Sequence, residues 1–254
     1  MQGLDSFRLE GRVALVTGSA RGLGAAMAAA LAQAGADVAV ADRADPGETA
    51  REIASTSGAR VLDLVADLAD RQASDKLVAD VIDGLGRLDI LVNNAGIIWR
   101  MPAADVADED WDRVIEINQT AVFRLCRAAG RHMLARGSGK IINIASLLSF
   151  QGGMTVPSYA AAKGAVAQIT KALANEWAGK GINVNAIAPG YMRTENTRPL
   201  TEDPVRSRQI LERIPAGRWG EPRDLAGAVV FLASAASDYV NGHVLVVDGG
   251  WMAR

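Results

Sequence analysis

Short runs of β-branched and aliphatic residues alternate with longer amphipathic stretches along the chain, and this alternation limits the possible folds more than any other feature. Runs such as VALVT, DILVNN, KIINIA and HVLVV are apolar on both faces, as in parallel strands that helices cover on both sides. Strict β-α-β alternation also implies right-handed crossovers. The sequence therefore predicts an α/β fold in which a doubly wound parallel sheet lies between two layers of helices.

The expected elements cover most of the chain. A chain of 254 residues suits one α/β domain, buries about three-quarters of its unfolded surface and needs no disulfide or metal. No repeat or linker divides it, so we expect a single domain over residues 1–254. We expect strands at residues 13–17, 37–42, 60–66, 89–93, 140–145, 183–188 and 244–247. We expect helices near residues 23–35, 46–57, 70–84, 103–136, 157–180 and 222–236.

One polar segment, residues 190–216, departs from this rhythm. It contains three prolines and follows the end of an expected strand. Ligands of open α/β sheets bind outside the carboxyl ends of the strands, and a long insertion in a compact domain is usually functional. We interpret this segment as a mobile lid over the ligand; the alternative is a surface excursion without function.

Charge and composition exclude several function classes. The 27 Lys and Arg against 29 Asp and Glu leave no basic excess for a nucleic-acid partner. Cys126 is the only cysteine and His132 and His243 are the only histidines, so neither a disulfide nor a zinc site is expected. Residues 1–11 lack the apolar core of a signal peptide, and the Ala-rich residues 25–36 are too short to span a bilayer. We expect a cytoplasmic protein without a metal or a membrane partner.

The first expected strand leads directly into TGSARGLG and then into a helix. Glycines here permit a tight turn and a close approach to a pyrophosphate, which the amides of the helix N-terminus stabilise. A glycine cluster alone would mark only a turn, but its place in a β-α-β unit predicts dinucleotide binding. The turn residues expected at the cofactor are Gly18, Arg21, Gly22, Leu23 and Gly24.

Asp42 ends the second expected strand and bears on the choice of cofactor. Its carboxylate can accept hydrogen bonds from the adenosine ribose and would repel a 2′-phosphate, which favours NAD. Arg21 and Arg43 argue for NADP, because guanidinium groups bind phosphate. We give Asp42 more weight and predict NAD; its alternative role is a turn or helix cap before Pro46.

Polar residues also follow the third and fourth expected strands. Asp67 and Leu68 lie where the adenine would bind, and Asn94, Ala95 and Gly96 lie where the adenosine ribose would bind. Each of these stretches alone would indicate only a turn. Because the carboxyl ends of parallel strands share one edge, their repetition predicts a common site.

Four residues form a candidate catalytic group. Tyr159 and Lys163 are four apart and share a helix face, Ser146 follows the fifth expected strand, and Asn118 lies among apolar neighbours in a long helix. Alone, the Tyr–Lys pair would more often be an exposed surface pair. Together the four residues suit hydride transfer to a ketone, with Tyr159 as the proton donor. Ser146 would hold the carbonyl oxygen, and Asn118 would fix a water that links Lys163 to solvent.

The ordinary pKa of tyrosine is about 10, which is high for base catalysis near neutral pH. We expect the Lys163 ammonium group and the positive nicotinamide ring to lower the pKa of Tyr159. Lys163 would also bind the ribose hydroxyl groups.

The set TGSARGLG, NNAG, Asn118, Ser146, YAAAK and Pro189-Gly190 resembles the short-chain dehydrogenase/reductase family, in family order and over essentially the whole chain. The resemblance implies a Rossmann-like sheet of seven strands and usually a homotetramer with two long central helices at one interface. It assigns the catalytic roles to the four residues above. It also implies cofactor contacts by Tyr159, Lys163, Pro189, Gly190 and Thr194.

The stretches IASLLSFQGGMTVPSYAAAK, NVNAIAPGYMRTENT, RIPAGRWGEP and DGGWMAR resemble one subgroup of this family, which acts on keto sugar acids in uronate catabolism. The resemblance implies NAD-dependent interconversion of 2,5-diketo-3-deoxygluconate and 2-keto-3-deoxygluconate. Such a substrate needs a cation for its carboxylate, and the candidates are Arg100 and Arg193, although each of these could instead be a solvated surface charge. The candidate substrate residues are Ser146, Tyr159, Arg100, Arg193, Gln151, Asn196 and Trp251, and Arg254 could reach a neighbouring subunit.

Two other function classes remain open. The first is an oxidoreductase of another ketone, such as a gluconate 5-dehydrogenase or a 3-oxoacyl carrier-protein reductase; the latter would prefer NADPH and a basic docking patch. The second is a catalytically inactive dinucleotide-binding scaffold. A scaffold would be expected to have a broken catalytic set, whereas all four residues are present.

Overall fold

The strands form one wholly parallel sheet in the order β3-β2-β1-β4-β5-β6-β7 in the computed structural model, which describes residues 3–254. The order reverses between β1 and β4, so a crevice opens at their carboxyl ends. The α/β prediction is confirmed, and every expected strand is present to within one residue at each end. The strands are β1 (Val13–Thr17), β2 (Asp37–Asp42), β3 (Val61–Val65), β4 (Ile90–Asn93), β5 (Gly139–Ile144), β6 (Ile182–Pro189) and β7 (Val244–Val247).

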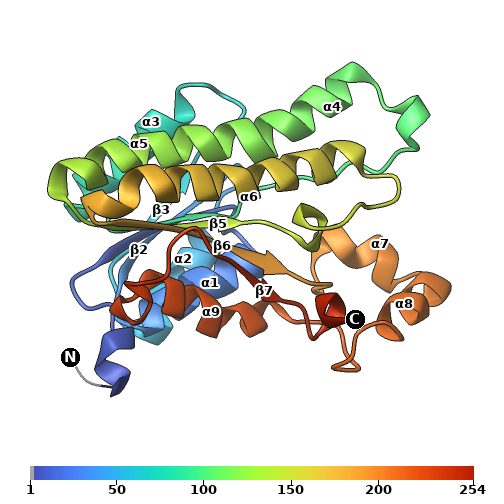
Figure 1. The fold of residues 1–254 in the computed structure, drawn as a ribbon. Coiled ribbons are helices and arrows are strands. Elements are labelled where there is room, and N and C mark those ends of the chain that lie inside the picture. The colour runs from blue at the N-terminus through green and yellow to red at the C-terminus, as the bar shows by residue number, and fades with distance from the viewer. Residues whose placement is uncertain (1–2) are drawn as a thin grey trace.

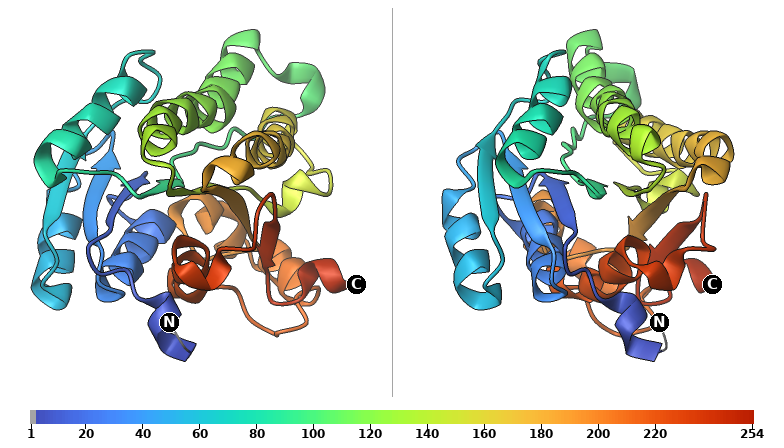
Figure 2. Two further views of the ribbon diagram at one scale, coloured as in Figure 1. Left: turned by 60° about the vertical axis from the view of Figure 1, so that its left-hand side comes forward. Right: turned by 90° about the vertical axis from the view of Figure 1, so that its left-hand side faces the viewer.

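Helices cover both faces of the sheet (Figure 1). One face carries α3, α5 and α6, the other carries α1, α2 and α9, and a separate apolar cluster fills each interface (Figure 2). Both clusters consist mainly of Ala, Val, Ile and Leu, as the low aromatic content requires. The helices of these two layers are α1 (Gly22–Gln33), α2 (Gly47–Ser57), α3 (Ala73–Leu85), α5 (Ala121–Arg136), α6 (Pro157–Trp177) and α9 (Ala226–Ala233).

The single helix expected over residues 103–136 is wrong in detail. The chain forms α4 (Asp108–Ile115), then a π turn at Glu116–Thr120, and then α5. Three acidic residues in the first turn of α4 favour a helix N-terminus at Asp108. The π turn coincides with Asn118, whose side chain bonds the loop after β4, and such turns are frequent at functional sites.

Two other expected helices are shorter than predicted. The helix expected at residues 157–180 ends at Trp177 and continues as a 3₁₀ turn, and the one expected at 222–236 is α-helical only in α9. Pro222 lies in a 3₁₀ turn that precedes α9 and is capped by Glu221 and Asp224. Helix boundaries thus follow caps and prolines more closely than apolar periodicity.

Residues 190–216 form a separate lobe beside the carboxyl edge of β6 (Figure 1). The lobe holds α7 (Arg198–Thr201) and α8 (Pro204–Leu211), and the Asp203 carboxylate caps α8. A third apolar cluster joins the lobe to the 3₁₀ turn Trp251–Ala253 near the C-terminus. Among residues 3–254 we find no helix with the length and apolar character needed to cross a bilayer.

Candidate active site

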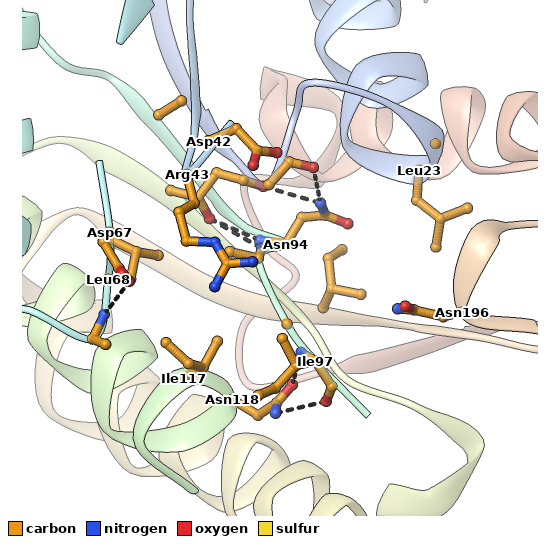
Figure 3. Close-up of a pocket in the computed structure, with 18 of the residues that line it drawn as sticks. Leu23, Asp42, Arg43, Asp67, Leu68, Asn94, Ile97, Ile117, Asn118 and Asn196 are labelled. Carbon is orange, nitrogen blue, oxygen red and sulfur yellow. Dashed lines mark hydrogen bonds between the residues drawn. The ribbon is translucent and has the colours of Figure 1, made fainter. Parts of the chain in front are cut away.

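The turn after β1 is packed too tightly for any residue but glycine at two positions. Gly18 has φ of 65°, and a Cβ atom there would lie 2.7 Å from Cα of Ala95. A Cβ atom on Gly24 would overlap the carbonyl oxygen of Gly18. The Asn94 side-chain amide fixes the turn by donating to the carbonyls of Thr17 and Gly18, both at 2.9 Å (Figure 3). Asn94 therefore shapes the turn, and both of its side-chain N–H groups are used for this.

The N-terminus of α1 is left open for an anion. Arg21 precedes the helix in an extended conformation, and no described side chain caps the first turn. The Thr17 hydroxyl accepts the N–H groups of Asn94 and Ala95 at 3.2 Å and so holds the loop after β4 against this turn. We did not predict Thr17, although a hydroxyl residue at the end of an apolar strand could have indicated this role. The free amides and the close-packed glycines fit a pyrophosphate.

Two carboxylates at the end of β2 and after β3 are oriented by the backbone. Asp42 accepts the N–H of Ala20 at 3.1 Å and of Ala44 at 3.2 Å, one on each oxygen, which leaves lone pairs for ribose hydroxyl groups. Asp67 accepts the N–H of Ala69 at 3.0 Å. Figure 3 shows Asp42 and Arg43 near Asp67 on one side of the pocket. The site thus offers both signs of charge where the adenosine would bind.

These groups line one cavity of about 540 Å³ at the carboxyl edge of the sheet. The predicted residues in its lining are Gly18, Arg21, Gly22, Leu23, Asp42, Asp67, Leu68, Asn94, Ala95, Gly96, Asn118, Tyr159, Lys163, Thr194 and Asn196. The predicted residues outside it are Gly24, Ser146, Pro189, Gly190, Arg100, Gln151, Arg193 and Trp251. Lining residues that we did not predict include Ile97, Arg113, Glu116, Ile117, Ile144 and Glu195. The cavity brings the cradle and the Tyr–Lys pair together in one space.

Lys163 lies one helical turn from Tyr159 on α6 and is almost completely buried. Its Nζ donates to the Ile144 carbonyl at 2.6 Å and lies 5.6 Å from the centroid of the Tyr159 ring. Burial lowers the pKa of Lys163 to about 8. The lysine can therefore exchange a proton near neutral pH.

The expected lowering of the Tyr159 pKa is wrong for the chain without a ligand. Burial raises the pKa of Tyr159, and a hydrogen bond with Ser146 and the charge of Arg100 offset this only in part. The Lys163 ammonium group is directed at the Ile144 carbonyl, so its charge does not counter the loss of hydration. Ser146 nevertheless lies beside the phenol as predicted, and its hydroxyl also accepts the Leu148 N–H at 3.2 Å.

Asn118 is fully buried, and backbone groups supply its partners. Its Nδ2 donates to the carbonyls of Ile97 and Val114, both at 2.9 Å, and its Oδ1 accepts the Ile97 N–H at 3.2 Å. Both side-chain N–H groups are used, so a water at this side chain would have to donate to Oδ1.

Among the candidate substrate residues outside the catalytic group, Asn196 lines the cavity and Arg100 lies near the Tyr159 phenol. The Arg100 guanidinium group donates to the Asn196 carbonyl at 2.9 Å. Burial lowers the pKa of Arg100, and the nearby phenols of Tyr159 and Tyr191 raise it. Arg193 is exposed, and Arg254 donates to the Glu212 carbonyl of its own chain at 2.7 Å. Arg100 thus connects the lobe to the phenol.

Gly190, Trp251 and Gln151, three further predicted residues, have local structural contacts. A Cβ atom on Gly190 would lie 2.6 Å from Cα of Asp248, so the chain passes close to the segment after β7. Trp251 is buried in the cluster beneath the lobe. Gln151 lies in the loop after Ser146, where its N–H bonds the Leu147 carbonyl. Within residues 3–254, no group of three His, Cys, Asp or Glu side chains is placed to hold a metal ion.

Known proteins are similar to this chain over nearly its whole length. A family model described as enoyl-(acyl carrier protein) reductase matches residues 18–252. The 2-dehydro-3-deoxy-D-gluconate 5-dehydrogenase of Escherichia coli K12 is 53% identical over 252 residues, which are 99% of each chain. The chain belongs to the short-chain dehydrogenase/reductase family. The resemblance of its motifs to this oxidoreductase family is confirmed.

Solved structures of the family agree. A protein of Agrobacterium tumefaciens, proposed to be a 2-deoxy-D-gluconate 3-dehydrogenase and holding NADP, is 55% identical, with a TM-score of 0.93 over 98% of this chain and 100% of the other. A gluconate 5-dehydrogenase of Burkholderia cenocepacia, in complex with NADP and tartrate, is 44% identical, with a TM-score of 0.94 over 100% of both chains. The Rossmann-like fold is confirmed, and a nicotinamide dinucleotide is the supported type of cofactor.

Proposed function

We propose that this chain interconverts 2,5-diketo-3-deoxygluconate and 2-keto-3-deoxygluconate with NAD(H). The observation that carries the proposal is the position of Tyr159 and Lys163 in the same cavity as the dinucleotide cradle, with Ser146 beside the phenol. The names of the relatives support the substrate class, because a keto sugar acid presents both the carbonyl that this chemistry needs and a carboxylate for Arg100.

In the proposed mechanism, a bound nicotinamide dinucleotide supplies the hydride for reduction and accepts it in the reverse direction. Tyr159 donates its proton to the carbonyl oxygen as that oxygen gains negative charge, while the Ser146 hydroxyl donates a hydrogen bond to the same atom. Burial keeps the phenol protonated at neutral pH, which is the form that reduction requires. Lys163, with a pKa of about 8, then returns a proton to Tyr159, and Asn118 positions the water that connects Lys163 to solvent.

Within this proposal, NAD is preferred over NADP because the Asp42 carboxylate at the end of β2 would accept hydrogen bonds from ribose hydroxyl groups and repel a 2′-phosphate. The NADP in the two solved relatives and the nearby Arg21 and Arg43 argue for a measurable NADP activity. We expect Asp42→Ala to lower the ratio of kcat/KM for NADH over NADPH about tenfold, the effect of losing one charge-assisted hydrogen bond. Arg43→Ala should raise the ratio. An unchanged ratio in Asp42→Ala would contradict the ribose role.

The substrate is tested by following NADH oxidation with 2,5-diketo-3-deoxygluconate, beside 5-keto-D-gluconate and a 3-oxoacyl thioester. Rapid turnover of the first compound alone supports the proposal. Turnover of 5-keto-D-gluconate alone would move the assignment to a gluconate 5-dehydrogenase. Cofactor binding without turnover of any ketone would indicate a scaffold.

The organisation around this site completes the proposal. Residues 190–216 act as a lid on a single domain, since the Arg100–Asn196 bond joins this segment to the catalytic region. The chain forms a homotetramer through α5 and α6, and Phe123 on α5 leaves 42% of its surface exposed for such a contact. Light scattering tests the tetramer, and cell fractionation tests the cytoplasmic location that the unpaired Cys126 thiol favours.

A further inference from the structure

Tyr191 lies at the same sheet edge as the catalytic serine, although the sequence analysis did not name it as a site residue. It follows Pro189, the last residue of β6, just as Ser146 follows Ile144, the last residue of the neighbouring β5. The backbone fixes its place, because its carbonyl accepts the Gly220 N–H at 2.9 Å and the preceding Gly190 N–H bonds Val247 at 2.9 Å.

The ring of Tyr191 is held by two tryptophans. Trp219 meets it edge-on, with the centroids 5.7 Å apart at 88°, and Trp251 lies 4.6 Å away at 53°. The guanidinium group of Arg213 covers Trp251 at 4.0 Å from the ring centroid. Both indoles are buried, whereas Tyr191 stays partly exposed. We call Trp219 and Trp251 the aromatic platform, and it leaves the phenol little rotational freedom.

Tyr191 and the catalytic phenol both lie near the same cation, Arg100. Arg100 interacts electrostatically with both Tyr159 and Tyr191, and its bond to the Asn196 carbonyl holds it there. A group that binds Arg100 therefore lies near both tyrosines. The electrostatics favour an anion at this place, since Arg100 is partly desolvated and its one hydrogen-bonded partner is a neutral carbonyl.

We infer that Tyr191 is a substrate-specificity residue whose hydroxyl group donates a hydrogen bond to the carboxylate of the sugar acid, beside the Arg100 guanidinium group. The inference rests on the proposed function and deepens it. Arg100 attracts the carboxylate by its charge. The Tyr191 hydroxyl group, fixed on the aromatic platform, orients the carboxylate through a directional hydrogen bond. A phenol that is ordered before binding loses little entropy when the acid binds, so its hydrogen bond contributes to affinity.

The test is Tyr191→Phe, which keeps the ring and removes the hydroxyl group. KM for 2,5-diketo-3-deoxygluconate should rise about tenfold, as for a lost hydrogen bond to a charged group, with kcat changed less than about twofold. The methyl ester of the same keto acid, which lacks the charge, should show less than about a threefold rise. The matched control is Tyr239→Phe, because Tyr239 is fully exposed.

A second readout does not need turnover. Tartrate is titrated into the enzyme with NADH bound, and tryptophan fluorescence reports the aromatic platform. Tyr191→Phe should weaken tartrate binding about tenfold and Tyr239→Phe should leave it unchanged. Equal tartrate affinity and equal KM in Tyr191→Phe and wild type overturn the inference. Tartrate binding that depends on Tyr191, without turnover of any keto sugar acid, overturns the proposed function and keeps the inference; wild-type enzyme that binds neither acid overturns both.

Discussion

The cofactor cradle and the substrate side of this site are built in different ways. The cradle consists of glycines, strand-end carboxylates and backbone amides that lie close together in the sequence or at neighbouring strand ends. The proposed substrate side depends on Arg100, from the loop after β4, and on Tyr191 and Asn196, from the segment after β6, and these two segments meet only in the folded chain. Cofactor recognition is thus a property of short segments, whereas substrate recognition is a property of the tertiary structure.

The largest effect expected from one substitution is in Tyr159→Phe, because this change removes the proposed proton donor at the junction of the two regions. We expect kcat to fall about 1000-fold, within the usual contribution of general acid catalysis. Cofactor affinity, measured by NADH fluorescence, should stay within about twofold because the cradle is intact. Retention of a tenth of the wild-type kcat would remove Tyr159 from the mechanism.

Lys163→Met tests how the charge of the buried lysine affects the stability of the folded chain. The folded-state pKa of Lys163, about 8, lies below the ordinary value of 10.5, so between these pH values the unfolded chain binds the proton that the folded chain releases. The contribution of Lys163 to stability is therefore poorest below pH 8 and improves as the pH rises to 10.5. In urea unfolding of the cofactor-free protein, the variant should be more stable than wild type by up to about 3 kcal/mol at pH 7.

This advantage should shrink steadily toward pH 10.5. The comparison cancels the other titrating groups, including Tyr159, because both proteins contain them. A stability difference that is independent of pH would show that the buried ammonium group is not titrating as stated.

Gly24→Ala tests whether the cradle tolerates no side chain. The added Cβ would overlap the Gly18 carbonyl and crowd the Asn94 amide at 2.6 Å, so we expect a loss of about 2 kcal/mol in unfolding free energy and at least tenfold weaker NADH binding. The control is Gly227→Ala in α9, where a Cβ meets nothing within 4 Å and alanine favours the helix. Equal NADH affinity in the two variants would show that the turn is not the tight cradle described here.

The smallest effect is expected at Thr155, in the loop that contacts the substrate side. Thr155 is the only non-glycine residue with positive φ among residues 3–254, at 60°, and its carbonyl accepts the Met101 N–H at 2.8 Å. A β-branched residue is strained in this region, by about 1 kcal/mol. Thr155→Gly should therefore raise the Tm by about 2 °C, while Thr155→Ala should not, as scanning calorimetry can show. A Tm of Thr155→Gly below that of Thr155→Ala would contradict this strain, because both changes remove the side chain beyond Cβ and only glycine relieves the positive φ.

The sequence predicted the parts of the structure that depend on local pattern. Apolar strands and the glycine turn placed the sheet and the cradle correctly, because each is determined within a few residues. The π turn at 116–120 was missed because it contains Asn118, whose side chain bonds the backbone of Ile97, and this residue is distant in the sequence. The rise in the Tyr159 pKa was missed because it depends on burial by several elements. Tyr191 was missed because its partners Trp219 and Trp251 are far along the chain.

The aromatic platform beneath Tyr191 has a consequence for biosynthesis. Trp251 is translated 155 residues after Gly96, the last residue of the early cradle segments. At about 5–20 residues per second, the ribosome takes about 8–30 s to cover this interval. A nascent chain therefore contains its nucleotide-binding segments well before it can complete the aromatic platform that positions Tyr191. By our proposal, a fragment released in that interval could not distinguish acid substrates.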